Sequence, residues 1–189
     1  MSPITRLTIE DYDRMIAAGA FAEPDSPRVE LIEGEILTMS PIGARHEEIV
    51  DLLNEWGATQ FPLDRVRVRI QQSVGIPLHN SAPQPDFAIV VKDNYSRGRP
   101  LAERVLLLVE VADSSLRYDR KVKGTLYANA GIADYWIVNL VGNCVEVFRQ
   151  PQDGRYVDCA TCHTGASIRP LAFPDVTLDI SQLFAALED

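Results

Sequence analysis

Two acidic residues lie inside apolar runs of this chain, where a carboxylate is costly to bury. Asp86 stands near the start of the run 85–91, and Glu110 interrupts the run 105–111. Both runs have the length and the β-branched content of buried strands. A carboxylate in such a strand is unfavourable unless a cation, a metal or several hydrogen-bond donors compensate its charge. The pair, followed by the polar segment 113–123, indicates a site for a divalent metal ion.

The spacing of the two acids is compatible with neighbouring strands. Asp86 and Glu110 lie 24 positions apart, enough for a strand, an exposed loop and a second strand. If these strands pair, both carboxylates point to the same end of the sheet. Hard oxygen ligands suit magnesium, with manganese as a substitute, and such an ion stabilises charge on a phosphoryl oxygen. The alternative is that each acid is solvated at a strand end or paired with a nearby arginine.

A helix predicted over 113–129 brings further polar side chains after the second acidic strand. Asp119, Lys123 and Tyr127 are spaced by four, which places them on one helical face. On a solvated face such an acid–lysine pair contributes only a few tenths of a kcal/mol and is common. Beside the acidic strands, Lys123 becomes a candidate to orient an attacking water and to offset phosphate charge. Asp119 would anchor this lysine, and Tyr127 would pack beneath it.

The elements that must position these residues alternate between helix and strand. We expect a hairpin over 29–39 that turns at Glu33-Gly34. The other predicted elements are helices over 8–18, 46–56 and 180–187, a strand over 65–70, a loop over 93–103, a hairpin over 135–149 and a strand pair over 155–168. This order predicts an α/β (α+β) fold with a central mixed β-sheet flanked by helices.

Length and charge limit the class of protein. The 189 residues suit a single domain, 1–189, with a core of about 29–150 and a C-terminal strand and helix extension over 151–189. The formal net charge of −9 argues against non-specific coating of nucleic acid or of an anionic membrane. A local basic groove stays open, because basic residues gather around the acidic strands: Arg65, Arg67, Arg69, Arg97, Arg99, Arg104, Arg117, Arg120, Lys121 and Lys123.

The chain shows no sign of export or of membrane insertion. No segment approaches the roughly 20 apolar residues that span a bilayer, and the N-terminus lacks the apolar core of a signal peptide. Three cysteines fit reduced thiols better than a disulfide framework. We therefore expect a cytoplasmic protein.

The segment 159–163, Cys-Ala-Thr-Cys-His, matches the attachment pattern of c-type haem. Covalent haem requires an exported chain, which this sequence does not indicate. A lone Cys-x-x-Cys with one histidine is also incomplete as a structural zinc site, which needs four ligands. We expect no haem, and interpret the segment as a surface hairpin.

An ordered set of motifs resembles the Uma-two family, restriction-endonuclease-like proteins of the PD-(D/E)XK nuclease superfamily. The resemblance covers roughly residues 6–150. The matching pieces are Val29 to Glu35, Ser40-Pro41, Arg45-His46, Pro85-Asp86, Glu110-Val111-Ala112, Tyr118-Asp119-Arg120, Lys123, Tyr127 and Gly131 to Val138.

This resemblance implies a four-stranded mixed sheet core and a metal bound by Asp86, Glu110 and the backbone carbonyl of Val111. The superfamily lysine expected two residues after the glutamate is Ala112 here. The resemblance to the Uma-two family implies that this lysine lies instead on the following helix. In this chain that lysine is Lys123, with Lys121 as a competitor. Glu33 and His46 are further candidates near the site, although each has an ordinary interpretation as a turn charge or a helix-start histidine.

The leading hypothesis is a magnesium-dependent endonuclease that hydrolyses phosphodiester bonds of DNA, with a homodimer expected for two-fold cutting of a duplex. The alternative is a catalytically silent nuclease-fold protein that binds nucleic acid or a protein partner. The acidic net charge slightly favours that alternative.

Overall fold

The centre of the computed structural model, which describes residues 5–22 and 27–187, is one six-stranded sheet with the order β3-β4-β5-β6-β7-β8. Its strands are β3 (Val66–Ile70), β4 (Phe87–Val91), β5 (Val105–Ala112), β6 (Asp134–Asn139), β7 (Cys144–Gln152) and β8 (Arg155–His163). Within this sheet β5 and β6 run parallel, and the other four neighbouring pairs are antiparallel. The mixed sheet predicted from the sequence is confirmed, with six strands in place of the expected four.

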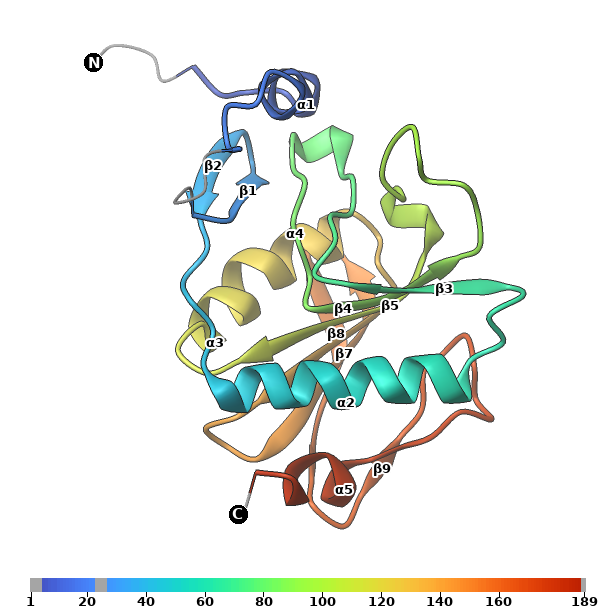
Figure 1. Ribbon diagram of the computed structural model, residues 1–189. Helices are drawn as coiled ribbons and strands as arrows, with labels where there is room; N and C mark the ends of the chain where they lie inside the picture. The colour runs from blue at the N-terminus through green and yellow to red at the C-terminus, as the bar shows by residue number, and fades with distance from the viewer. Residues whose placement is uncertain (1–4, 23–26, 188–189) are drawn as a thin grey trace.

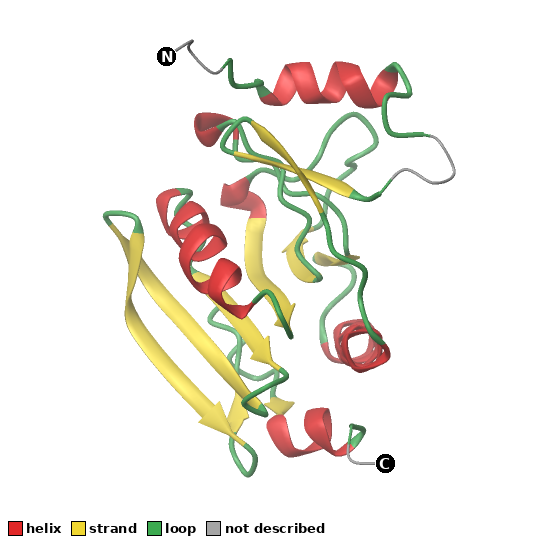
Figure 2. Cartoon of the chain, turned by 90° about the vertical axis from the view of Figure 1, so that its left-hand side faces the viewer, coloured by secondary structure: helices red, strands yellow, loops and turns green. Residues whose placement is uncertain are grey.

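Helices cover both faces of the sheet (Figures 1 and 2). On one face, α2 (Ala44–Gln60) and α5 (Ile180–Ala185) pack in a cluster with Leu107 and Val109 of β5. On the other face, α4 (Gly124–Asn129) packs with Leu108 and Ala112 of the same strand. Because successive side chains of a strand point to opposite faces, Glu110 lies on the α4 face of β5.

A small layer covers one end of the sheet. It consists of α1 (Ile9–Ala17) and the hairpin of β1 (Val29–Ile32) and β2 (Glu35–Thr38), drawn at the top of Figure 1. The hairpin turns at Glu33 and Gly34, whose φ angles of 49° and 79° suit a tight two-residue turn. A Cβ at Gly34 would lie 2.9 Å from the carbonyl oxygen of Leu7, so the close contact between these segments requires glycine.

The helix predicted over 113–129 is interrupted. The structure has α3 (Leu116–Tyr118), a π-helical segment η3 (Asp119–Lys123) and then α4. Single π-helical turns inside helices are rare and occur often at functional sites. Gly131, with a φ of 75°, follows the end of α4 as the sequence predicts.

The predicted strand pair over 155–168 is wrong. β8 pairs with β7 at the edge of the central sheet, whereas β9 (Ser167–Ile168) pairs with β10 (Leu178–Asp179). The reason is the turn at Asp153 and Gly154, whose positive φ values let β7 and β8 form a long hairpin. The Cys-x-x-Cys-His segment lies in β8, and the three cysteines are free thiols.

Short 3₁₀ helices η1 (Pro77–His79) and η2 (Ala102–Arg104) complete the connections. None of the helices in the described ranges is long and apolar enough to cross a membrane.

Candidate active site

The strand register brings Asp86 and Glu110 together. Phe87 pairs with Val109 in the antiparallel ladder of β4 and β5, so Asp86, one residue earlier, stands opposite Glu110. The backbone carbonyl of Asp86 also accepts a hydrogen bond of 3.0 Å from the N–H of Gln71, which extends the β3–β4 ladder by one pair. Both carboxylates are buried and share one face of the sheet at the point where β4 begins.

Asp86 is held by three donors. Its Oδ2 accepts the Val111 N–H at 2.9 Å and lies 3.1 Å from Nε2 of His46, and its Oδ1 accepts Nε2 of Gln71 at 3.2 Å. Burial alone would raise the pKa of Asp86, but the hydrogen bond and charge of His46 and the Val111 N–H outweigh it, so this pKa is lowered. Because Asp86 is ionised, His46 Nε2 must be the donor.

Glu110 has the opposite electrostatic character. Its Oε1 accepts Nζ of Lys123 at 3.0 Å and the hydroxyl of Tyr127 at 2.7 Å. Burial raises the pKa of Glu110 well above its ordinary value, and the charges of Asp119 and Asp86 raise it further against the opposing effect of Lys123. Glu110 therefore resists ionisation unless more positive charge is brought close to it.

Lys123 is the buried lysine of its helix, whereas its competitor Lys121 is exposed. Besides Glu110, its Nζ lies 3.4 Å from Oε2 of Glu30. Burial disfavours the ammonium form, but attraction to Glu110 and the other surrounding acids is stronger and raises the pKa of Lys123. Lys123 thus carries a positive charge at neutral pH.

Glu30 belongs to the site and was not found from the sequence. It lies on β1, is buried, and accepts the backbone N–H of Gln84 at 3.1 Å in addition to pairing with Lys123. Glu33, the expected candidate from this hairpin, is exposed at the turn and does not line the pocket. The alternation of side chains along β1 could have identified Glu30, because Glu30 and the buried Ile32 share one face of this strand.

Asp119 does not anchor Lys123 as expected. Its Oδ2 accepts the hydroxyl of Ser115 at 2.6 Å, and in the described part of the chain no ion pair within 4.0 Å joins Asp119 to Lys123. The π-helical turn explains the offset, because residues four apart no longer stack as they do in an α-helix. Burial raises the pKa of Asp119.

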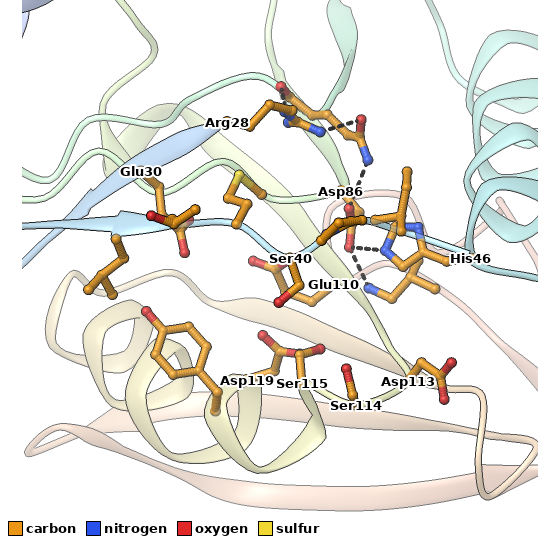
Figure 3. A pocket seen from close by; sticks show the side chains of 18 of the residues that line it. Arg28, Glu30, Ser40, His46, Asp86, Glu110, Asp113, Ser114, Ser115 and Asp119 are labelled. Atoms are coloured by element: carbon orange, nitrogen blue, oxygen red, sulfur yellow. Dashed lines mark hydrogen bonds and ion pairs between the residues drawn. The ribbon is translucent and has the colours of Figure 1, made fainter. Parts of the chain in front are cut away.

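These side chains line a pocket of about 800 Å³ (Figure 3). Its charged lining residues are Arg28, Glu30, Asp86, Glu110, Asp113, Asp119 and Lys123. Of the basic residues expected around the acidic strands, Lys123 lines the pocket and the others do not. Three of these others pair with acids outside it: Arg99 with Asp13, Arg104 with Asp93, and Arg120 with Glu146. The expected basic surrounding of the site is therefore wrong, because these arginines neutralise acids of other regions.

The charge balance of the pocket fits a cation. Four buried carboxylates, those of Glu30, Asp86, Glu110 and Asp119, surround the single buried ammonium of Lys123. Within the described ranges, Oε2 of Glu110 accepts no hydrogen bond. No three His, Cys, Asp or Glu side chains of the described residues form a ready-made metal cluster. An ion here would take two carboxylates and complete its coordination with backbone oxygen or water, which is usual for magnesium.

The mixed sheet, its flanking helices and the buried acids with a nearby lysine define a restriction-endonuclease-like protein. The Uma2 family, described as "Putative restriction endonuclease", matches residues 9–181, and this chain belongs to that family. The confirmed family includes the segment 151–181, beyond the part on which the sequence resemblance rested.

A solved structure shares the fold. It is described as "a putative nuclease belonging to DUF820" from Anabaena variabilis ATCC 29413, and it matches with a TM-score of 0.72 at 17% identity over 98% of this chain and 99% of that chain. At this identity the similarity establishes the fold alone. No curated protein matches the sequence.

Proposed function

We propose that this protein is an endonuclease that hydrolyses phosphodiester bonds of DNA with a divalent metal ion, magnesium or manganese. The observation that carries the proposal is the buried pair Asp86 and Glu110 on adjacent strands, with Lys123 bonded to Glu110 in the same pocket. Membership of the Uma2 family supports the reaction class.

Asp86, Glu110 and the backbone carbonyl of Val111 would hold the ion. When bound, it would supply Lewis-acid stabilisation of the charge that develops on the phosphate oxygens. Asp86 is prepared for this role, because His46 and the Val111 N–H keep it ionised and fix its orientation. Tyr127 fixes Glu110 in the same way through its hydroxyl.

Lys123 would act on the substrate. An ammonium group has three N–H donors: one donates to Glu110, and a second faces Glu30, with which Lys123 forms an ion pair at 3.4 Å. The third is left for a phosphate oxygen or for the attacking water, whose approach it would orient. Glu30 is then a positioning residue that, together with Glu110, holds Lys123, and Asp119 adds negative charge that keeps Lys123 protonated.

A catalytically silent protein that binds nucleic acid or a protein partner is the second candidate. The observation that favours it is the scarcity of exposed cations at the pocket, where Arg28 is the exposed basic lining residue. The homodimer predicted from the sequence belongs to either candidate and stays a prediction.

Cleavage assays with matched variants test the proposal. Glu110→Gln should lower kcat on DNA by about 10²–10³-fold, because it removes one of the two carboxylates that would hold the ion and so weakens the stabilisation of transition-state charge. Glu33→Gln, which removes an exposed carboxylate outside the pocket, should leave kcat unchanged. Equal cleavage by Glu110→Gln and the wild type would contradict the assignment of this site.

Metal binding is tested separately from turnover. Added magnesium or manganese should raise the melting temperature of the wild type, because a ligand that binds only the folded state stabilises it by about 2.7 kcal/mol at a hundredfold excess over Kd. Asp86→Ala should show no such rise. If metal raises neither melting temperature and no DNA is cleaved, the silent alternative is the better account.

A further inference from the structure

The groups that would meet the scissile phosphate lie deep in the pocket. Asp86, Glu110 and Lys123 are only 6%, 3% and 4% exposed. In Figure 3, Ser40 lies on one side of Glu110, and Ser114 and Ser115 lie on the other. A phosphodiester reaches these groups only if its strand enters between the two walls of the pocket, which are formed by the 39–43 and 113–115 segments. In a duplex the backbone lies on the surface of a stiff rod with a persistence length of about 50 nm, so bringing one phosphate inwards requires the duplex to bend, kink or open, which costs free energy.

The charge of the pocket also disfavours a duplex. Double-stranded DNA carries one negative charge per roughly 1.7 Å of its axis, and proteins hold it with several lysines and arginines. Of the lysines and arginines in the described chain, Arg28 and Lys123 line this pocket, and Lys123 is already paired with two acids. Five acids line the same walls. One strand carries about half the charge density of two and leaves its bases free to contribute to binding.

The remaining walls suit the flat faces of unpaired bases. The apolar lining residues include Leu37, Met39, Ile42 and the ring of Tyr118. Tyr118 is half-buried, and its hydroxyl has no hydrogen-bond partner in the described structure. Aromatic and apolar side chains bind bases that are not stacked in a duplex, and a pocket of about 800 Å³ lies within the range of roughly 300–1,000 Å³ that holds small ligands.

We infer that the pocket accepts a phosphodiester of an unpaired DNA strand and excludes one that is held in a duplex. This inference rests on the proposed nuclease function and specifies its substrate. Unpaired nucleotides would enter between the walls formed by the 39–43 and 113–115 segments, with a base against Tyr118 and the phosphate directed towards Lys123. Duplex DNA would become a substrate only where its base pairs open.

Three forms of one labelled oligonucleotide test the inference: the single strand, the full duplex, and a duplex with an internal unpaired bubble. With magnesium or manganese, kcat/KM on the single strand should exceed that on the full duplex by at least about tenfold, the factor that corresponds to opening one average base-pair step. Cleavage of the third substrate should fall within the bubble. Equal or faster cleavage of the full duplex overturns this inference and leaves the nuclease function standing. Cleavage of none of the three overturns the nuclease function and the inference with it.

Binding without turnover provides the second measurement. In EDTA, fluorescence anisotropy of the same single strand should show that Tyr118→Leu binds about tenfold more weakly than the wild type, because base–aromatic stacking is lost. Tyr118→Phe keeps the ring and removes only the unpartnered hydroxyl, so it should bind as the wild type does. Equal affinity of Tyr118→Leu and the wild type, or equal weakening of duplex and single-strand binding, contradicts the proposed entry of unpaired bases.

Discussion

The buried acids form two groups, those that line the pocket and two others on β6 and β7, and the groups differ in how the acids are compensated. Glu146 of β7 accepts both donors of Arg120 at 2.6 and 2.7 Å, and the Asn139 amide at 2.9 Å. Asp134 of β6 accepts the Trp136 indole N–H at 2.7 Å and Arg149 at 2.8 Å. Both oxygens of each of these two acids are occupied, and each acid has a cation of its own.

The pocket acids are compensated differently. Glu30, Glu110 and Asp119 surround the one positive charge of Lys123, and the pKa values of Glu110 and Asp119 are raised. Asp86 has His46 and the Val111 N–H as partners and a lowered pKa, and the pKa of Glu146 is likewise lowered by the hydrogen bonds from Arg120 and Asn139 against the opposing effect of burial. A buried acid with its own cation is part of the architecture. A group of buried acids with fewer compensating cations than carboxylates favours the binding of a further cation.

This comparison limits what an acid in an apolar run indicates. Val145-Glu146-Val147 has the same pattern as Val109-Glu110-Val111, yet Glu146 forms a structural ion pair with Arg120 of η3 and a hydrogen bond with Asn139 of β6. The pattern identified buried acids correctly but does not by itself distinguish a structural ion pair from a metal site. The distinction needs the number of cations that the fold delivers.

The largest expected effect is on the stability of the pocket. Lys123→Ala would leave Glu110 and Glu30 buried without their cation, which should lower the free energy of unfolding by about 3–5 kcal/mol. Lys121→Ala removes an exposed lysine two positions away and should change it by less than about 0.5 kcal/mol. Urea denaturation in EDTA measures both values.

Arg120→Ala measures the corresponding loss of stability at Glu146. Arg120 is about half exposed, and Glu146 would keep the amide of Asn139, so this loss should be clearly smaller than that of Lys123→Ala. If Arg120→Ala were the more destabilising of the two, the positive charge of Lys123 would be less important to the pocket than the geometry indicates.

Much of the frame was predictable from the sequence. Apolar runs gave the strands, and the pairing of the two acidic runs placed Asp86 and Glu110 at one end of the sheet, as the register of β4 and β5 shows. The choice of Lys123 over Lys121 followed from the helical face that it was expected to share with Asp119 and Tyr127. The side chains of Lys123 and Tyr127 do reach Glu110, whereas Asp119 bonds to Ser115.

The missed features depend on geometry that no local pattern carries. A π-helical turn shifts Asp119 away from Lys123, and helical spacing assumes a regular helix. Glu30 and Glu33 belong to the same short hairpin, and the exact position of its turn decides which of them faces inwards. Arg99 was misplaced because its partner, Asp13, lies 86 residues away in the sequence, beyond the reach of any local pattern.

An intermediate effect of opposite sign should separate the two groups of acids. Asp119→Asn removes a buried charge that burial and the neighbouring acids disfavour, so the metal-free protein should gain about 0.5–2 kcal/mol. Glu146→Gln removes a charge that Arg120 stabilises and should cost about 1–3 kcal/mol. Thermal unfolding in EDTA measures both, and the same sign for both variants would show that the pocket acids are compensated as well as Glu146 is.

The smallest expected effect is on the pH dependence of stability, and it has opposite signs for Glu110 and for Glu146. The raised pKa of Glu110 means that its folded form holds a proton more tightly than its unfolded form, so its contribution to stability is present at low pH and is lost as the pH rises above the ordinary carboxyl range. The lowered pKa of Glu146 means the reverse, because its contribution is present above the ordinary range and is lost as the pH falls. In EDTA, Glu110→Gln should therefore gain stability relative to the wild type as the pH rises above about 4.3, the ordinary glutamate pKa, whereas the stability deficit of Glu146→Gln should be constant above that pH and should shrink as the pH falls below it. Magnesium should reduce the gain of Glu110→Gln, because the ion stabilises the ionised carboxylate that the wild type alone provides. Parallel pH profiles for the two variants would mean that Glu110 is compensated by Lys123 as fully as Glu146 is by Arg120, and the electrostatic case for a metal ion in the pocket would then fail.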